Sequence, residues 1–347
     1  MPAYPGHVKI VVVFESITLP SQVQDKVARD NPQPDLSIII VSWNVREHLL
    51  NCLGALFSPD VHGNLSLEVI VVDNASHDGS AQAATQFPVI LRTNKENLGY
   101  GRANNAGLQI SQGRHLMILN PDTLPHAGSL QPLVDFADAR PEAGIISPRL
   151  LNPDGSVQAA AFSFPTLVMS ILDLFPLPNF IPGRFRRKLL NSRINGRYHD
   201  EPTRTHPYRI EHPLGAAFLL RREAYEQCGG FDESIFMYSE EIDLALRYED
   251  SGWECWQVPQ SHIVHLGGQS TRQMPDTMFI ELWRSRLHIY DHYYSLPSRL
   301  ALRLILAIAM LRDMWSAQLI TRRTRQTDYL ASQMKRAKAV LRMALHR

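Results

Sequence analysis

The chain has 347 residues, of which 44% are hydrophobic and 20% charged, the composition of an ordinary packed globular protein. Its net charge of +1 gives no strong field for nucleic acid, so we do not expect a nucleic-acid partner. The three cysteines, Cys52, Cys228 and Cys255, lie far apart and form no CxxC pair. They predict neither a structural zinc site nor a disulfide framework, which agrees with a reducing cytoplasm.

Residues 1–34 predict an N-terminal extension. A short strand-like run, Lys9–Phe14, is followed by a polar stretch that ends in a proline-rich linker at residues 31–34. The apolar run Val8–Phe14 is too short for a secretory signal. The sequence contains no run of about 18 apolar residues, so no transmembrane helix is predicted.

From Leu36 the sequence alternates apolar strands with amphipathic helices. Strands are predicted at Leu36–Val41, Leu67–Val72, Val89–Leu91 and His115–Leu119, and helices at Arg46–Phe57 and Tyr100–Ser111. This alternation predicts an α/β fold with a mostly parallel, doubly wound sheet. In such sheets ligands bind beyond the carboxyl ends of the strands.

The second half is less regular. The predicted elements are a hairpin at Arg149–Ala160, an irregular excursion over residues 165–210, a strand at Leu214–Leu220, a helix at Ser239–Ser251 and a strand at Trp253–Val258. Beyond Gln273 the chain is predicted to be helical.

Polar residues follow three of the predicted strands. They are Ser42-Trp43-Asn44, Asp73 to Ser80 and Asn120-Pro121-Asp122-Thr123, with Asn97 to Asn105 between the second and the third. A carboxylate such as Asp73 can accept the imide N–H of a pyrimidine base. Asp122 can hold Mg²⁺ or Mn²⁺, which neutralises a diphosphate leaving group, and Arg102 can add positive charge beside the phosphates.

Each of these residues also has a simpler interpretation. A lone aspartate at a strand end often caps a helix, Asp78-Gly79 predicts a turn, and Asn120-Pro121-Asp122 can form an ordinary turn. The combination on successive strand ends favours a binding site.

Three carboxylates, Glu240, Glu241 and Asp243, fall in the first turn of the helix predicted from Ser239. They can compensate the helix dipole, or one of them can act as a general base for an acceptor hydroxyl. They cannot all face one cleft, because neighbouring helix positions point in different directions. His265 can serve as a structural hydrogen-bonding residue or reach a metal ion or phosphate.

In their order along the chain these motifs resemble the family 2 glycosyltransferases with the GT-A fold. The resemblance extends from about Leu36 to Thr271. It rests on the strand-end motifs, Asn97 to Gly101, Gly215 to Phe218, Gly229 to Glu233 and Glu240 to Leu244. The Asn-Leu-Gly-Tyr-Gly, Asn-Pro-Asp and Asn-Pro-Asp-Gly-Ser-Val phrases, with Phe236-Met237-Tyr238, are typical of bacterial rhamnosyltransferase-like members.

The resemblance implies that Asp73 binds the base, that Asn120 and Asp122 occupy the place of the DxD metal motif, and that Glu241 is the base of an inverting transfer. It assigns Ser42, Asn44, Asp73, Asn74, Ser76, Asn97, Gly99, Arg102 and Asn120 to the donor, Glu240 and Gly215 to the acceptor side, and Asp122 and His265 to the metal. Two departures are Asn120 in place of the first aspartate and Glu240-Glu241 where Glu-Asp is usual. The second departure leaves the assignment between Glu240 and Glu241 open.

The expected organisation is an extension (1–34), a GT-A catalytic domain (35–272) and a helical, basic segment (273–347). The apolar run Leu300–Met314 precedes many Arg and Lys residues. Such a helix can lie in an anionic membrane interface, pack on the catalytic domain or form a dimer contact. Membrane association would suit a lipid-linked acceptor on the cytoplasmic face of the inner membrane.

The expected donor is dTDP-rhamnose, with other nucleotide diphosphate sugars as alternatives, and the expected acceptor is a hydroxyl of a glycan or lipid-linked sugar. Two other classes of function are considered. A nucleotidyltransferase needs a lysine-bearing, Gly-rich loop, which is absent after Val41. A non-catalytic sugar-nucleotide-binding protein is the second alternative.

Overall fold

The computed structural model describes residues 33–175, 177–178, 181–198, 200, 202–268, 273–324 and 327–346, with side chains left undescribed at 322–329. The predicted strand Lys9–Phe14 and nearly all of the predicted extension lie outside these residues.

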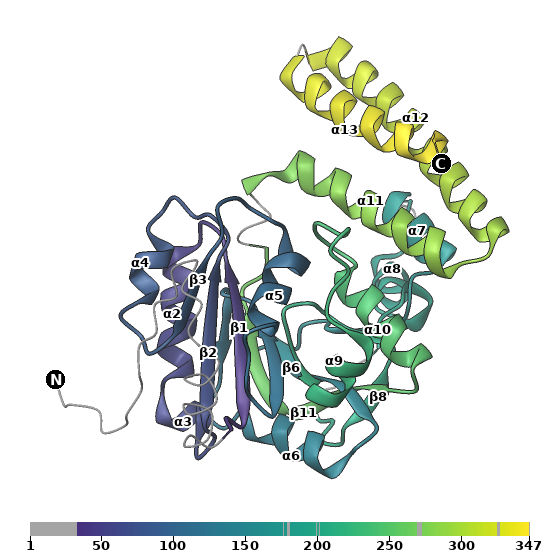
Figure 1. Cartoon of the computed structure of the whole chain (residues 1–347). Helices are drawn as coiled ribbons and strands as arrows, with labels where there is room; N and C mark the ends of the chain where they lie inside the picture. Colours follow the sequence, from purple (N-terminus) through teal and green to yellow (C-terminus); the bar gives the residue numbers. More distant parts are fainter. Residues whose placement is uncertain are drawn as a thin grey trace.

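Nine strands form a mixed, mostly parallel sheet in the order β3-β2-β1-β4-β10-β6-β11-β5, with β8 paired to β11 (Figure 1). The bounds are β1 Leu36–Ser42, β2 Leu67–Asp73, β3 Ile90–Thr93, β4 His115–Leu119, β5 Thr123–Pro125, β6 Ala143–Leu151, β8 Tyr208–Ile210, β10 Ala217–Arg221 and β11 Glu254–His265. Parallel pairing joins β1 to β2 and β4, β2 to β3, and β6 to β11, whereas β5, β8 and β10 pair antiparallel. A separate two-stranded sheet consists of β7 Ala161–Phe162 and β9 His212–Pro213.

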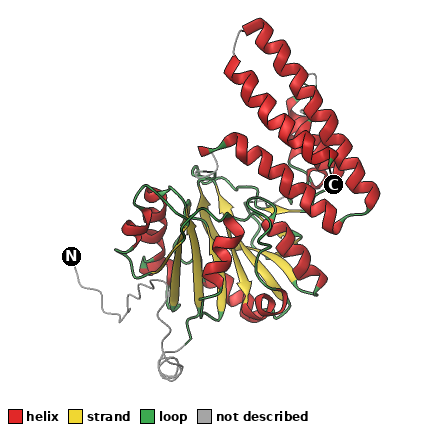
Figure 2. Cartoon of the chain, turned by 45° about the horizontal axis from the view of Figure 1, so that its top comes forward, coloured by secondary structure: helices red, strands yellow, loops and turns green. Residues whose placement is uncertain are grey.

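Helices cover both faces of the sheet because successive strand residues point to opposite sides. Ile38 and Ile40 pack into one core with α2, α3, α4 and α6, while Ile39 packs into a second core with α5, α9 and α10 (Figure 2). The bounds are α2 Arg46–Leu56, α3 Pro59–His62, α4 Ser80–Ala84, α5 Tyr100–Leu108, α6 Gln131–Ala139, α9 Arg222–Cys228 and α10 Glu240–Asp250. The result is the three-layer arrangement predicted from the strand–helix alternation.

A third core holds the C-terminal helices together. It is formed by α7 Leu167–Leu174, α11 Pro275–Tyr293, α12 Leu296–Thr324 and α13 Thr327–Leu345, with Trp283, Leu306 and Val340 among its buried side chains. Helix α11 crosses above the sheet, and α12 pairs with α13 beyond it (Figure 1). Within the described residues, none of the helices has the length and apolar character needed to cross a bilayer.

Three predictions for the second half are corrected. The Asn152–Gly155 turn exists, but its first arm belongs to the long strand β6, and its second arm joins only through the bridge between Leu151 and Val157. Strand β11 continues to His265 instead of ending at Val258, with a shift of register between Val258 and His262, around Pro259. Proline lacks the N–H that the strand ladder requires, so the regular pairing is interrupted there, although the strand continues.

The segment at 165–210 is more ordered than predicted. It contains α7, α8 Gly183–Leu190, a 3₁₀ turn at Arg193–Asn195 and β8. Its proline and arginine content hides these short elements, of which α7 is capped by Thr166, whose Oγ1 accepts the N–H of Met169 at 3.2 Å.

Candidate active site

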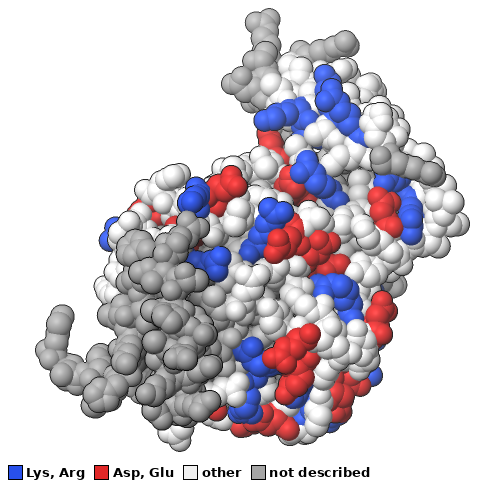
Figure 3. Space-filling model, viewed as in Figure 1, with Lys and Arg blue, Asp and Glu red and all other residues white. Residues whose placement is uncertain are grey.

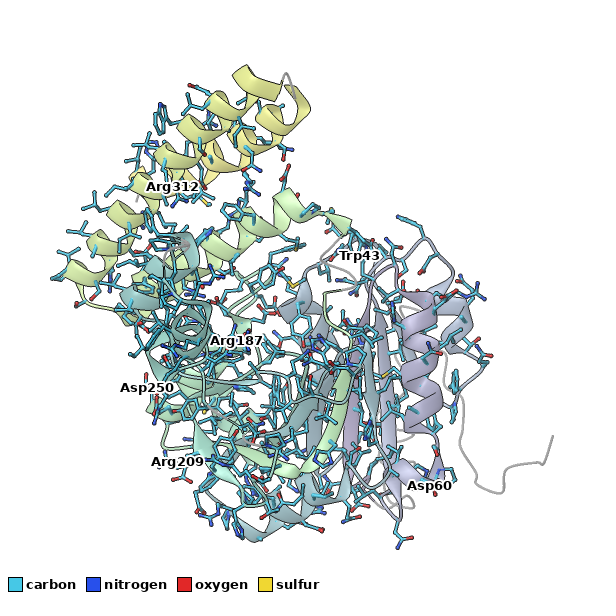
Figure 4. The ribbon with its side chains drawn as sticks, turned by 180° about the vertical axis from the view of Figure 1, so that it is seen from behind. Trp43, Asp60, Arg187, Arg209, Asp250 and Arg312 are labelled. Carbon is cyan, nitrogen blue, oxygen red and sulfur yellow. The ribbon has the colours of Figure 1, made fainter. Side chains whose placement is uncertain are left out.

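The carboxyl ends of β1, β2 and β4 bring the predicted donor residues to one edge of the sheet. Ser42 and Asp73 are direct partners in the parallel register of β1 and β2. Asn120 follows β4, the strand on the other side of β1. Figure 4 shows Trp43 at the same end of the sheet, close to α11.

Asp73 is 3% exposed, and its two carboxylate oxygens have different surroundings. Its Oδ2 accepts the N–H of Ser76 at 3.0 Å. Its Oδ1 and the hydroxyl of Ser42 are buried without a hydrogen-bond partner among the described residues. Buried polar atoms are normally paired, so these two atoms fit a polar ligand such as the imide edge of a pyrimidine.

Asn44 and Ser76 hold two loops together. The N–H of Asn44 donates to Ser76 Oγ at 3.0 Å, and Asn44 Oδ1 accepts the N–H of His77 at 2.8 Å. Asp78 Oδ1 accepts from the N–H and the hydroxyl of Ser80, and Gly79 has a φ of 82°, so the predicted turn is confirmed. The side chains of Asn44 and Ser76 therefore position the loop around Asp73.

Asn74 connects the Asp73 loop to the loop before α5. Its amide nitrogen donates to Asn97 Oδ1 at 2.8 Å and to the Gly99 carbonyl at 3.2 Å. Its Oδ1 accepts from Leu98 N–H at 3.0 Å and from Asn94 at 3.1 Å. Because these bonds occupy its polar atoms, Asn74 shapes the donor side of the site from behind.

Gly99 allows the loop before α5 to approach the loop before α10 closely. It has a φ of 84° and a ψ of 177°, a conformation that glycine alone adopts readily. A Cβ there would lie 2.5 Å from the Phe236 carbonyl oxygen, and the N–H of Tyr100 donates to the same oxygen at 2.9 Å. Tyr238 and Ser239, just before α10, have positive φ values of 66° and 63°. Strain of this kind is common where a loop is held in one functional geometry.

The two loops enclose a cavity of about 120 Å³, which we call the donor cavity. Its lining residues are Val41, Trp43, Asn74, Asn97, Gly99, Tyr100, Asn120, Pro121, Asp122, Met237 and Gly268.

Asp122 and His265 meet at the wall of this cavity. Both are largely buried, and His265 Nε2 lies 3.5 Å from Asp122 Oδ1. The other ring nitrogen, Nδ1, lies 2.8 Å from Gln158 Oε1, while the Gln158 amide nitrogen donates to Asn152 Oδ1 and the His265 carbonyl. With the amide oriented this way, the Gln158 oxygen faces Nδ1, and Nε2 is the ring nitrogen that faces Asp122.

A carboxylate beside an oriented imidazole suits Mn²⁺ or Mg²⁺. The described residues contain no group of three or more His, Cys, Asp or Glu side chains that could hold a metal. Two protein ligands are nevertheless common for these ions in nucleotide sites, where phosphate and water complete the shell.

Glu241 faces a second hollow of about 230 Å³, which we call the acceptor cavity. Its lining residues are Phe162, Pro165, Met169, Asp173, Asn195, Arg197, His212, Leu214, Tyr238, Ser239, Glu241, Ile242, Leu282 and Arg286. Burial raises the pKa of Glu241 to about 7, against the nearby charge of Arg286.

The other two carboxylates of α10 have different surroundings. Glu240 is 4% exposed, and burial, followed by the charge of Glu241, holds its pKa well above the usual value. Asp243 accepts from Arg247 Nε at 2.9 Å and from the Tyr293 hydroxyl at 2.7 Å, which makes it an anchor of α10. Of the three acids, only Glu241 lines a cavity.

Tyr100 and Gly215 lie between the two cavities. The Tyr100 hydroxyl donates to the Gly215 carbonyl at 2.5 Å, and a Cβ on Gly215 would lie 3.7 Å from the Glu241 carboxylate. Burial, and then the charges of Glu240, Glu241 and Asp122, raise the pKa of Tyr100. The carboxylates from both halves of the chain therefore converge around this tyrosine.

Four of the predicted donor residues, Asn74, Asn97, Gly99 and Asn120, line the donor cavity. The other five do not line it: Ser42, Asn44, Asp73, Ser76 and Arg102. Arg102 is about half exposed, lies 3.5 Å from Glu233 in an ion pair, and does not line the donor cavity. The expectation that Arg102 lies beside the phosphates stays a prediction.

Several lining residues were not identified from the sequence as site residues. Gln158 and Arg286 belong to none of the motifs in the sequence. Tyr100 and Tyr238 were recognised within motifs but not given a role.

The mixed sheet with helices on both faces is the GT-A fold of glycosyltransferases. The sequence profile of Glycosyl transferase family 2 matches residues 37–229, and the chain belongs to this family. It is therefore a glycosyltransferase, and the alternative of a nucleotidyltransferase is set aside.

Similar proteins agree with this assignment. The chain is 31% identical over 261 residues, 69% of this chain and 78% of the other, to a protein of Mycobacterium tuberculosis named N-acetylglucosaminyl-diphospho-decaprenol L-rhamnosyltransferase. The mannosyltransferase PcManGT of Pyrobaculum calidifontis, solved with GDP-Man and Mn²⁺, matches with a TM-score of 0.50 and 16% identity over 93% of both chains. GalNAc-T7, solved with UDP, GalNAc and Mn²⁺, matches with a TM-score of 0.51 and 18% identity over 76% of this chain and 49% of that one. These two structures show the shared fold.

Proposed function

We propose that this glycosyltransferase moves L-rhamnose from dTDP-rhamnose to a hydroxyl of a lipid-linked sugar, with inversion at the anomeric carbon. The observation that carries the proposal is the position of Asp122 and Glu241 in two adjoining cavities with Tyr100 and Gly215 between them. A direct displacement needs the leaving group and the attacking hydroxyl on opposite sides of the sugar. In this arrangement Asp122 would lie on the side of the leaving group and Glu241 on the side of the hydroxyl.

The donor would lie in the first cavity. Asp73 Oδ1 and the Ser42 hydroxyl would bind the pyrimidine, and Asn97 and Asn120 would line the sugar and diphosphate. Asp122 and His265 would hold a divalent cation, with Gln158 fixing the tautomer of His265. A bound cation would supply charge neutralisation for the departing diphosphate. The choice of donor is supported by identity to the mycobacterial rhamnosyltransferase.

The acceptor would lie in the second cavity. Its hydroxyl would donate its proton to a Glu241 carboxylate oxygen as the oxygen attacks the anomeric carbon, and the bond to the diphosphate would break. A pKa of about 7 suits this role, because the carboxylate is ionised in a useful fraction at neutral pH and still attracts a proton.

The test measures transfer directly. Purified protein with dTDP-rhamnose, Mn²⁺ and an N-acetylglucosaminyl diphospholipid should form a disaccharide lipid whose new linkage is inverted by NMR. A thermal-shift panel of UDP-, GDP- and dTDP-sugars with and without Mn²⁺ identifies the donor independently, because a ligand stabilises in proportion to its affinity. Retention of configuration, or stabilisation by a different nucleotide alone, would contradict the corresponding part of the proposal.

We also propose peripheral association with the cytoplasmic face of a membrane. One face of α12 exposes Leu296, Leu300, Leu304, Ile308, Leu311 and Trp315, each at 50% or more. Helix α13 exposes Lys335, Lys338 and Arg342 at helical spacing, and Figure 3 shows basic and uncharged surface over this helical pair. An apolar row beside basic residues suits an anionic lipid surface, and residues 273–347 would form the membrane-facing segment beyond the catalytic domain at 35–272.

Vesicle sedimentation tests this surface. The double change Leu304→Asp and Ile308→Asp should abolish binding to anionic vesicles, whereas Ile194→Asp, an equally exposed residue on another segment, should not. If the wild type stays in the supernatant at low salt, the lipid assignment is wrong. If the double change instead dissociates a dimer in size-exclusion chromatography, the apolar face is a contact between copies.

A further inference from the structure

Arg286, on α11, has no role in the transfer described above. Its Nε and Nη1 are buried, and neither has a hydrogen-bond partner among the described residues. A buried guanidinium without a partner is costly, so such groups normally pair with an anion. Arg284, two residues earlier, is an ordinary surface arginine. Its side chain is 58% exposed, and it lies 2.8 Å from Glu281.

The surroundings of Arg286 leave room for an anion. It lines the acceptor cavity together with Arg197, which comes from the segment after the 3₁₀ turn. Asp173 and Glu241 line the same cavity and interact with Arg286 through their charge, but neither forms a described ion pair with it. Burial raises the pKa of both acids, and Arg286 lowers it in each case.

The remaining wall of the cavity combines apolar side chains with Asn195, Tyr238 and Ser239. Phe162, Leu214 and Leu282 line it, and His212 stacks on Phe162 with ring centroids 5.6 Å apart. Burial lowers the pKa of His212 to about 4, so this ring is neutral near pH 7. The cavity therefore offers apolar surface, two arginines and a base within one space.

We propose that Arg286, assisted by Arg197, binds a phosphate or diphosphate group of the acceptor and so places the acceptor hydroxyl at Glu241. The guanidinium presents five N–H donors in a plane, a geometry that matches phosphate oxygens. The donor diphosphate is assigned to the other cavity, beside Asp122 and His265. The inference rests on the proposed function and narrows its acceptor to sugars that carry phosphate near the accepting hydroxyl.

The experiment compares a charged with a neutral acceptor. Transfer to N-acetylglucosaminyl diphosphofarnesol and to octyl N-acetylglucosaminide is measured for the wild type, Arg286→Ala, Arg286→Lys and Arg284→Ala. Arg286→Ala should raise KM for the diphosphate acceptor about 10- to 100-fold, as expected for lost hydrogen bonds to a charged group, with kcat changed little. KM for the neutral acceptor should stay within about twofold, Arg286→Lys should be intermediate, and Arg284→Ala should match the wild type.

Other outcomes would overturn the inference. An equal loss of kcat with both acceptors, accompanied by a shifted pH profile, would mean that Arg286 acts only through Glu241. A raised KM for the donor would place Arg286 in the donor site. If the wild type used neither acceptor, the proposed function would fail separately. Calorimetry with inorganic pyrophosphate in EDTA would then still test Arg286, because binding should weaken in Arg286→Ala and not in Arg284→Ala.

Discussion

The pH dependence of the chemical step tests Glu241 most directly. With a pKa of about 7, Glu241 is about one tenth ionised at pH 6 and about nine tenths ionised at pH 8. If the ionised form is the base, the single-turnover rate should rise about tenfold between these pH values. A glutamate with an ordinary pKa near 4.5 would be ionised throughout this range and would give a flat profile.

Two isosteric substitutions test which of the two neighbouring glutamates is the general base. Glu241→Gln should lower the rate about 10²- to 10⁴-fold and remove the pH-dependent limb, because the amide cannot accept the proton. It should leave donor affinity nearly unchanged, since Glu241 does not line the donor cavity. Burial and then the charge of Glu241 raise the pKa of Glu240, and Glu240 does not line the acceptor cavity. Glu240→Gln should therefore keep the pH-dependent limb.

The assay is a rapid-quench single turnover with radiolabelled dTDP-rhamnose, saturating acceptor and fixed Mn²⁺, so that product release does not mask the chemical step. A flat profile in the wild type, or a limb that survives in Glu241→Gln and vanishes in Glu240→Gln, would refute the assignment of Glu241.

Three further changes test the framework of the site. Gly99→Ala should lower the free energy of unfolding by about 1–3 kcal/mol in denaturant titration, because alanine is strained at a φ of 84°; an unchanged midpoint would contradict the close approach to the loop before α10. Gln158→Leu should weaken Mn²⁺ activation about 10- to 100-fold, because His265 loses the partner that orients it; an unchanged Mn²⁺ titration would exclude His265 from the metal site. Arg149→Ala should cost about 3–5 kcal/mol of stability, because Asp200, 6% exposed, loses a partner at 2.7 Å; a change in thermal midpoint no larger than that of Arg140→Ala, a half-exposed surface pair, would contradict this.

The first half of the fold follows from its sequence because each buried strand is a continuous apolar run with polar residues at its end. Ser42, Asp73 and Asn120 could be placed together from this pattern alone, since carboxyl ends of neighbouring parallel strands share an edge. The exact role of each polar residue could not be predicted from this pattern. Asn44, Asn74 and Ser76 hold loops together, and that distinction depends on hydrogen bonds between segments about 20 to 30 residues apart.

The second half of the fold is harder to predict from the sequence, because its contacts are long-range and its hydrophobic pattern is interrupted. Pro259 breaks the alternation of β11 without ending the strand, and the prolines of 165–210 obscure α7 and α8. Arg286 lies outside the segment that the family profile matches, on a helix in which every second residue from Glu281 to Ile289 is buried, a pattern more typical of a strand. Its place in the acceptor cavity depends on the position of α11, which crosses the end of the sheet.

Helix α11 is the physical link between the acceptor cavity and the C-terminal helices. Its Ser285 hydroxyl donates to the Met237 carbonyl at 2.8 Å, which ties it to the strained loop before Glu241, while Leu282 and Arg286 line the cavity itself. Trp283, Leu287 and Tyr290 of the same helix belong to the core shared with α12 and α13. An acceptor whose phosphate sits at Arg286 would therefore have its lipid chain beside the same helical unit that exposes the apolar face of α12. Anchoring of the lipid and orientation of the reactive hydroxyl would then depend on one rigid element.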